Sequence, residues 1–246
     1  MTLIDDLLEA ISPCDEVVED VRVGISWTGV LGGGRLGLAK TYPIPAHSYV
    51  RDFGRLTGKG LAELAEYLRS WNLVEAGIGL AALNAALEPR GKTGINALDV
   101  IAEEGRGKKV VMVGRFPQVE EIRAVAREFY VLELDQCLID PERGVLPSTV
   151  ADYVIPGSDI VAITGSTIAN KSADHLLRLS RDAGAYTIVL GPSTPMSDVL
   201  FEYGADAVAG LEVRDPAAVL RKIGQSGGMI NERAYPGEIT FRYWER

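Results

Sequence analysis

Two short turns rich in hydroxyl groups follow apolar runs in the second half of the chain. Their residues are Thr164, Gly165, Ser166 and Thr167 in the first turn, and Gly191, Pro192, Ser193 and Thr194 in the second. Free backbone amides and the dipole of a following helix favour a carboxylate or phosphate at such turns. A structural role is the alternative, because Thr167 could cap a helix beginning near Asn170, and Thr194 before Pro195 suits a helix start. Two such turns on one sheet edge favour a ligand site.

Two charged turns precede them along the chain. Gly114, Arg115, Phe116 and Pro117 form the first turn after a strand, and Glu133 to Gln136, with Asp135, form the next. Arg115 could pair with an anionic ligand or remain a solvated surface cation. The first turn lacks the GxGxxG pattern, which disfavours the usual grip on the pyrophosphate of NAD. An acid at the end of a second strand can hold a ribose, although ordinary surface charge explains Glu133 and Asp135 equally well.

The remaining polar candidates carry weaker signals. Asn96 ends the junction that begins at Lys92, which could line a cleft between two domains or be a capped turn. His47 lies in a loop and matches no metal motif, and we expect His175 to be packed or exposed within a helix. Asn84 lies in an apolar helix and needs a hydrogen-bond partner if it is buried.

Bulk composition excludes several classes of protein. The chain has 246 residues, a net charge of −9 and 47% apolar residues, with no basic stripe that would favour nucleic acid or an anionic membrane. The two cysteines are far apart in sequence and form neither a disulfide framework nor a zinc motif. The acidic start is not a signal peptide, and no apolar stretch is long enough to span a bilayer. We therefore expect a cytoplasmic protein. The sequence leaves open whether the chain forms a homo-oligomer.

The elements that position these turns alternate from residue 108 onward. Continuous apolar strands, each followed by a helix, are typical of a parallel sheet that helices cover on both faces. We expect strands at 110–113, 130–134, 160–163, 186–190 and 207–209, and helices at 117–129, 149–155, 170–181, 196–203 and 216–223. This is a Rossmann-like α/β domain over 96–246, in which ligands bind beyond the carboxyl ends of the strands. The segment 239–244 is expected to be an extra strand or a docking segment.

Residues 1–95 have a different pattern, which predicts an α+β domain. A helix over 3–11 precedes a strand over 17–27, a glycine-rich turn and a second strand over 35–42, which together predict a hairpin. Two helices follow, at 60–70 and 73–87. The second helix is apolar almost all round and should be buried, with Asn72 as its cap and with Gly77 and Gly79 allowing close approach.

The segment 75–85, the turn at 113–117 and the two hydroxyl-rich turns resemble the "putative heavy-metal chelation" family. The resemblance covers nearly the whole chain. It implies an N-terminal domain similar to the enolase N-terminal fold, joined to a Rossmann-like domain, with a site in the cleft between them.

Three functions remain open at this point. The first is binding of, or catalysis on, a small anionic metabolite or a metal chelate in the interdomain cleft. Oxygen ligands such as Glu133 and Asp135 would suit a hard cation, and a metal could also arrive already bound to an organic chelator. The second is an enzyme that uses a nucleotide-type cofactor such as S-adenosylmethionine or NAD. The third is a non-catalytic regulatory or assembly protein, because fold alone does not choose among them.

Overall fold

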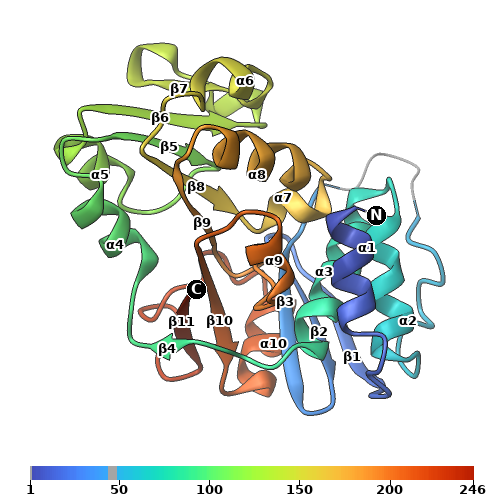
Figure 1. Cartoon of the computed structure of the whole chain (residues 1–246). Helices are drawn as coiled ribbons and strands as arrows, with labels where there is room; N and C mark the ends of the chain where they lie inside the picture. Colours follow the sequence, from blue (N-terminus) through green and yellow to red (C-terminus); the bar gives the residue numbers. More distant parts are fainter. Residues whose placement is uncertain (1, 44–48) are drawn as a thin grey trace.

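The computed structural model describes residues 2–43 and 49–246, which form two packed parts (Figure 1). The smaller part holds an antiparallel sheet of β1 (Val18–Val23), β2 (Trp27–Gly32) and β3 (Arg35–Lys40). The single strand expected over 17–27 is wrong. The chain turns at 24–26, where the Gly24 amide donates to the Trp27 carbonyl at 2.9 Å. The β-branched residues of this segment favour a strand, but Ile25 lies at the tip of the turn and is 77% exposed. Strand propensity is therefore overridden here by the tertiary structure.

Helices cover both faces of this small sheet. They are α1 (Leu3–Ala10), α2 (Leu61–Ala65) with the 3₁₀ turn η1 (Glu66–Arg69), α3 (Leu73–Ala86) and, from the end of the chain, α10 (Pro216–Gly224). As expected, Asn72 caps α3, which is buried nearly all round. A Cβ at Gly79 would lie 2.1 Å from the Leu68 amide nitrogen, so glycine there permits the close packing of α3 against η1.

The larger part is built on an eight-stranded sheet in the order β4-β11-β10-β9-β8-β5-β6-β7. The six strands from β10 to β7 run parallel, whereas β11 is antiparallel to β10 and β4 is antiparallel to β11. The bounds are β4 (Lys92–Thr93), β5 (Lys109–Val113), β6 (Glu128–Glu133), β7 (Val145–Pro147), β8 (Ile160–Thr164), β9 (Tyr186–Leu190), β10 (Ala207–Val213) and β11 (Ile239–Glu245).

The chain order of the parallel strands makes this sheet doubly wound. From β5 the chain proceeds outward to β6 and β7, then returns to the other side of β5 and proceeds to β8, β9 and β10. Counted from β5, this is the 3-2-1-4-5-6 order of Rossmann folds, whose crevice lies where the direction of winding reverses. That point is the carboxyl end of the neighbouring strands β5 and β8. The expected α/β class is therefore confirmed, and β4 and β7 are two short strands that the sequence did not predict.

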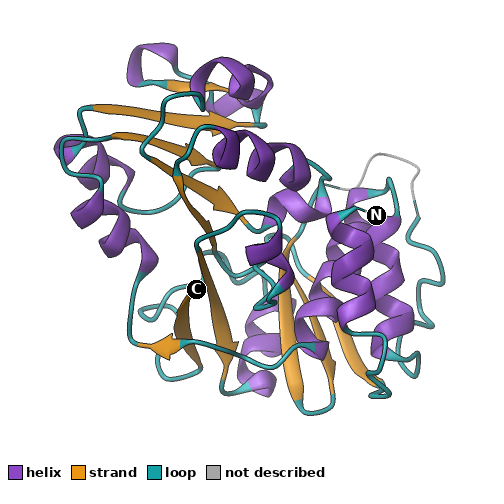
Figure 2. Ribbon diagram, viewed as in Figure 1, coloured by secondary structure: helices purple, strands orange, loops and turns teal. Residues whose placement is uncertain are grey.

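Helices cover the two faces of the large sheet (Figure 2). One face packs against α4 (Ala97–Glu104) and α5 (Val119–Val125). The other packs against α6 (Ala151–Val154), α7 (Ser166–Ala169), α8 (Ala173–Asp182) and α9 (Val199–Glu202), and its core continues into the smaller part. Short 3₁₀ turns η2 (Gln136–Leu138), η3 (Pro141–Arg143) and η4 (Ser148–Val150) connect β6 to α6. No helix in 2–43 or 49–246 is long and apolar enough to cross a membrane.

Several predicted helices are shorter in the structure. The helix expected over 117–129 is only α5, because Gln118 before it has a left-handed backbone (φ 63°) and β6 already begins at Glu128. The helix expected over 170–181 begins only at Ala173 as α8, because Lys171 has φ 68° and separates it from α7. Of the helix expected over 196–203, only α9 forms.

Candidate functional site

The turn after β5 lies directly against the end of β8. Gly114 follows β5 with φ +91°, and a Cβ at this position would lie 2.9 Å from Thr164 Cγ2. Its amide donates to the Leu132 carbonyl of β6 at 2.8 Å, which fixes the turn to the neighbouring strand as well. A left-handed glycine here brings the first turn and Thr164 together at the switch point.

The two hydroxyl-rich turns also meet. A Cβ on Gly165 would lie 2.5 Å from Thr194 Oγ1 and 2.6 Å from the Thr194 Cα, so the turns after β8 and β9 are in contact at one edge of the sheet. The Thr164 and Ser166 hydroxyls lie 3.1 Å apart, and both residues are half-buried. Thr167 is buried and donates to the Thr164 carbonyl at 2.7 Å, so this hydroxyl stabilises α7 and not the later helix.

Ser193 and Thr194 lie at the contact between the two parts. Ser193 is 3% exposed, and its Oγ accepts from the Lys40 amide of β3 at 2.9 Å. Asn84 of α3 donates to the Leu38 carbonyl at 2.8 Å and to the Ser193 carbonyl at 3.2 Å. These bonds join β3, α3 and the turn after β9, so the buried Ser193 and Thr194 lie within the contact between the two parts.

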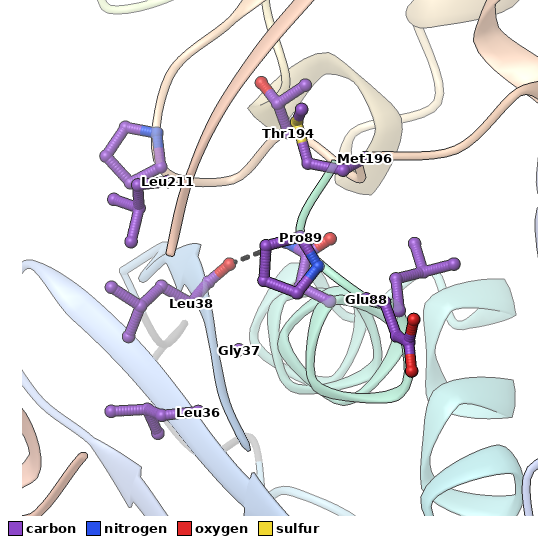
Figure 3. A pocket seen from close by; sticks show the side chains of 11 residues that line it. Leu36, Gly37, Leu38, Glu88, Pro89, Thr194, Met196 and Leu211 are labelled. Atoms are coloured by element: carbon purple, nitrogen blue, oxygen red, sulfur yellow. Dashed lines mark hydrogen bonds between the residues drawn. The ribbon is translucent and has the colours of Figure 1, made fainter. Parts of the chain in front are cut away.

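A small cavity of about 30 Å³ lies beside this contact, among β3, the end of α3 and the turn after β9 (Figure 3). Apolar side chains such as Leu38, Met196 and Leu211 line it together with Asn84 and Thr194. Within the described part of the chain, the buried Asn84 Oδ1 and Thr194 Oγ1 have no hydrogen-bond partner. A space of this size has room for about one water molecule and not for an organic ligand.

The smaller part reaches the switch point through Tyr42. This half-buried residue follows β3, and its hydroxyl donates to the Ser166 carbonyl at 2.8 Å. Burial raises the pKa of Tyr42, and the nearby Glu133 carboxylate raises it further, so the hydroxyl remains a proton donor at neutral pH. Tyr42 therefore borders the sheet edge at which Thr164 and Ser166 lie.

Lys171 forms a second link between the parts. Its half-buried ammonium donates to the Ser70 carbonyl of the smaller part and, at 2.7 Å, to the Ala169 carbonyl at the end of α7. Burial lowers the pKa of Lys171 to about 8. The sequence pattern did not single out Tyr42 or Lys171. Tyr42 lies just after the end of β3, and Lys171 directly follows the candidate residue Asn170. These positions are the signal that could have identified them.

The turn after β5 presents side chains of mixed exposure. Arg115 and Pro117 are exposed, whereas Phe116 is half-buried and lies between Gly114 and Gly191. Asn96 is exposed at the start of α4, where its Oδ1 caps the Leu98 amide at 3.0 Å. The Asn96 Nδ2 lies 3.4 Å from Gln118 Oε1, so Asn96 flanks the same turn.

The remaining candidates use their polar atoms in local turns. Asp135 is exposed, and its Oδ1 accepts from the Cys137 amide at 3.0 Å. Glu133 at the end of β6 accepts from the Leu134 amide at 2.8 Å. The Asn170 Oδ1 accepts from the Ser172 hydroxyl at 2.7 Å. His47 lies outside the described residues. His175 on α8 lies 3.0 Å from Asp152 of α6 in a solvent-exposed contact.

Two family models match the chain. Residues 96–239 match DUF364 and residues 4–87 match DUF4213, and both families carry the description "putative heavy-metal chelation". Because the DUF364 match covers more than half of the chain, the chain belongs to the DUF364 family. A family member of unknown function from Desulfitobacterium hafniense has a crystal structure that matches with a TM-score of 0.84 and 27% identity, covering 99% of this chain and 98% of that one.

Two other similar proteins extend the comparison. The structure of a member from Pyrococcus horikoshii gives a TM-score of 0.80 at 22% identity and covers 99% of this chain and 98% of that one, which supports the fold alone. An uncharacterized protein of Methanocaldococcus jannaschii is 28% identical over 166 residues. That match spans 64% of this chain and 62% of the relative.

The description of the family raises the question of whether this chain offers ligands for a heavy metal. Among residues 2–43 and 49–246, no three His, Cys, Asp or Glu side chains gather into a group that could hold a metal ion. The polar side chains at the switch point end in the Thr164 and Ser166 hydroxyls and the Arg115 guanidinium, and none of these groups is a ligand that soft heavy metals prefer. The described side chains therefore do not fit a soft metal ion held by protein ligands alone.

A larger hollow of about 380 Å³ lies beside β11 and the edge strand β4 of the large sheet. Its lining includes Lys92, Ile95, Tyr243 and Arg246. Asn96 follows Ile95, so the segment leading into α4 borders this hollow as well as the turn after β5. The hollow provides a comparison region for any ligand experiment.

Proposed function

We propose that this chain binds a small anionic metabolite or a metal already held by an anionic organic chelator, in the crevice between its two parts at the ends of β5 and β8. The observation that carries the proposal is the contact of Gly114 with Thr164 at the point where the winding of the sheet reverses. Doubly wound sheets bind ligands at this point. The family description supports a link with metals but does not specify the ligand.

The chemistry of the crevice favours an anion. Arg115 is exposed beside it and carries a permanent positive charge, while the Thr164 and Ser166 hydroxyls can donate hydrogen bonds. A chelator would bring its own metal ligands, which agrees with a crevice whose described residues include no cluster of soft ligands. Metal would then enter as cargo and not as a resident ion.

A thermal-shift panel tests this proposal. Metal salts alone, carboxylate chelators alone and the same chelators loaded with metal are compared at concentrations up to 100 times the expected Kd. Binding at that ratio stabilises the folded chain by about 2.7 kcal/mol, which raises Tm by roughly 5–10 °C for a chain of this size. We expect the chelators, free or loaded, to raise Tm and the metal salts alone to leave it unchanged.

Variants locate the response. Thr164→Ala should weaken the ligand-induced rise in Tm with little loss of stability, because its hydroxyl lies half-buried at the switch point. Thr57→Ala is the matched control, since Thr57 is exposed in the smaller part. Ser193→Ala should instead lower stability, because it removes the acceptor for the Lys40 amide. If the ligand raises the Tm of Thr164→Ala as much as that of the parent, the switch point is not the ligand site.

A second candidate is an enzyme with a nucleotide-type cofactor, S-adenosylmethionine or NAD-like. The strand order and the placement of Glu133 at the end of β6 favour it, because in such folds an acid at this position binds the ribose. Three features oppose it: the turn after β5 lacks glycines beyond Gly114, α5 is only seven residues long, and Glu133 already accepts backbone amides. Stabilisation by S-adenosylmethionine or NAD in the same panel, without any response to chelators, would favour this candidate.

A further inference from the structure

The ring of Phe116 lies across the end of β8. A Cβ on Gly191, which follows β9, would lie 3.5 Å from Phe116 Cε1, and one on Gly114, which follows β5, would lie 4.0 Å from Cε2. Since β8 lies between β5 and β9 in the sheet, a ring whose outer carbons approach both glycines spans the end of β8. Gly114 has a φ of +91° and Gly191 a φ of +107°, a conformation that favours glycine. Because neither residue has a Cβ, the ring can lie close to both.

This ring is held in place without being enclosed. Phe116 packs against the apolar cluster that α4 and α5 form with the large sheet, yet the residue is only half-buried. Within the described part of the chain, the two aromatic pairs are Tyr49–Phe53 and Phe201–Trp244, so no other ring stacks on Phe116. A fixed ring with an accessible surface and no aromatic partner is suited to stack on a planar ligand.

The groups beside this ring determine what kind of planar ligand fits. Arg115 precedes it in the chain and is exposed, and Thr164 lies at the strand end that the ring covers. A cation and a hydroxyl donor next to an aromatic surface match a flat ring that bears a carboxylate. Because an aromatic face also attracts the positive edge of another ring, an offset or edge-on arrangement is expected.

We propose that Phe116 is the specificity-determining residue of the crevice, and that it selects planar aromatic or heteroaromatic carboxylates over saturated ones of the same size and charge. This proposal rests on the proposed function, since it names the ligand class of that same site. Pyridine carboxylates, free or as metal chelates, belong to this class.

Matched pairs of ligands test the selectivity. Benzoate is compared with cyclohexanecarboxylate, and benzene-1,3-dicarboxylate with cis-cyclohexane-1,3-dicarboxylate, by isothermal titration of the full chain. Aromatic stacking predicts that each planar member binds roughly 2- to 12-fold more tightly than its saturated partner. In Phe116→Leu, which keeps an apolar side chain in contact with the cluster, the ratio should fall to about one, while Phe116→Tyr should keep it. Both variants are compared with the parent by circular dichroism to show that they are folded.

The outcomes separate the two proposals. If both members of each pair bind equally and Phe116→Leu changes nothing, the selectivity proposal is wrong and the anion site stands. If neither member of either pair binds the parent chain at millimolar concentration, both proposals are wrong. If the planar preference is present but survives in Phe116→Leu, another surface recognises the ring and the assignment to Phe116 is wrong.

Discussion

Replacing Gly165 with alanine tests whether the turns after β8 and β9 converge as described. The Gly165 backbone is helical (φ −58°, ψ −18°), so alanine adds no backbone strain. Its Cβ would, however, lie 2.5 Å from Thr194 Oγ1 and 2.6 Å from both the Cα and the amide nitrogen of Thr194. Ordinary contacts begin near 3.4 Å, so the turn after β9 must move by almost an ångström. Two of the three atoms belong to the backbone, which a rotamer change cannot displace.

The magnitude follows from two opposing effects. Overpacking of this kind costs about 1–3 kcal/mol, and the loss of glycine freedom in the unfolded chain returns about 0.4–1 kcal/mol. The two ranges leave a net loss of about 0–2.6 kcal/mol. Because backbone atoms must move, we expect Gly165→Ala to fall in the upper part of this range and to lower the free energy of unfolding by about 1–2.6 kcal/mol, measured by urea denaturation. The same displacement should weaken the response to anionic ligands, because the turns form one edge of the proposed crevice.

Gly228→Ala is the matched control. A Cβ at Gly228 meets nothing within 4 Å, so this variant should be as stable as the parent to within about 0.5 kcal/mol. A Gly165→Ala variant as stable as the Gly228→Ala control would refute the reasoning, because the turns would then have room between them that the structure does not provide.

Two further predictions concern the joints between the parts. Asn84→Ala should lower the free energy of unfolding by about 1–3 kcal/mol in urea denaturation, because it leaves the Leu38 and Ser193 carbonyls without their donor; equal stability would show that these bonds contribute nothing. Lys171→Met should change how the free energy of unfolding depends on pH. Burial lowers the pKa of Lys171 in the folded chain from 10.5 to about 8, so between these pH values the unfolded chain binds more protons than the folded chain. The stability of the parent relative to Lys171→Met should therefore rise as pH increases from about 8 to 10.5, and a flat difference across that window would show that Lys171 is not desolvated.

Much of the fold follows from local patterns. The apolar runs of β5, β8 and β9 are buried on both faces, so their residues alone indicate a parallel sheet between helices. The helix α3 is apolar all round for the same physical reason, since it lies between the small sheet and other helices. Boundaries were harder to predict, because the start of α5 after Gln118 and the break at Lys171 depend on left-handed backbone conformations that these side-chain types do not encode.

The site shows where sequence reasoning reaches its limit. The positions of Thr164, Ser166 and Gly114 at strand ends could be predicted, because parallel strands bring their carboxyl ends to one edge. The burial of Ser193 and Thr194 could not, since it depends on β3 and α3 packing against the turn from far away in the sequence. The same is true of Tyr42, whose bond to the Ser166 carbonyl joins residues 124 positions apart.

The most direct test of the account is an NMR titration of the isotope-labelled chain with pyridine-2,6-dicarboxylate, with and without a bound divalent metal. We expect the backbone amides of Gly114, Arg115, Thr164 and Ser166 to shift in a saturable manner, while those of Gly91 and Lys92 beside the hollow at β4 and β11 stay unchanged. Shifts confined to Gly91 and Lys92, or no shifts at the ends of β5 and β8, would contradict the claim that the switch point is the ligand site.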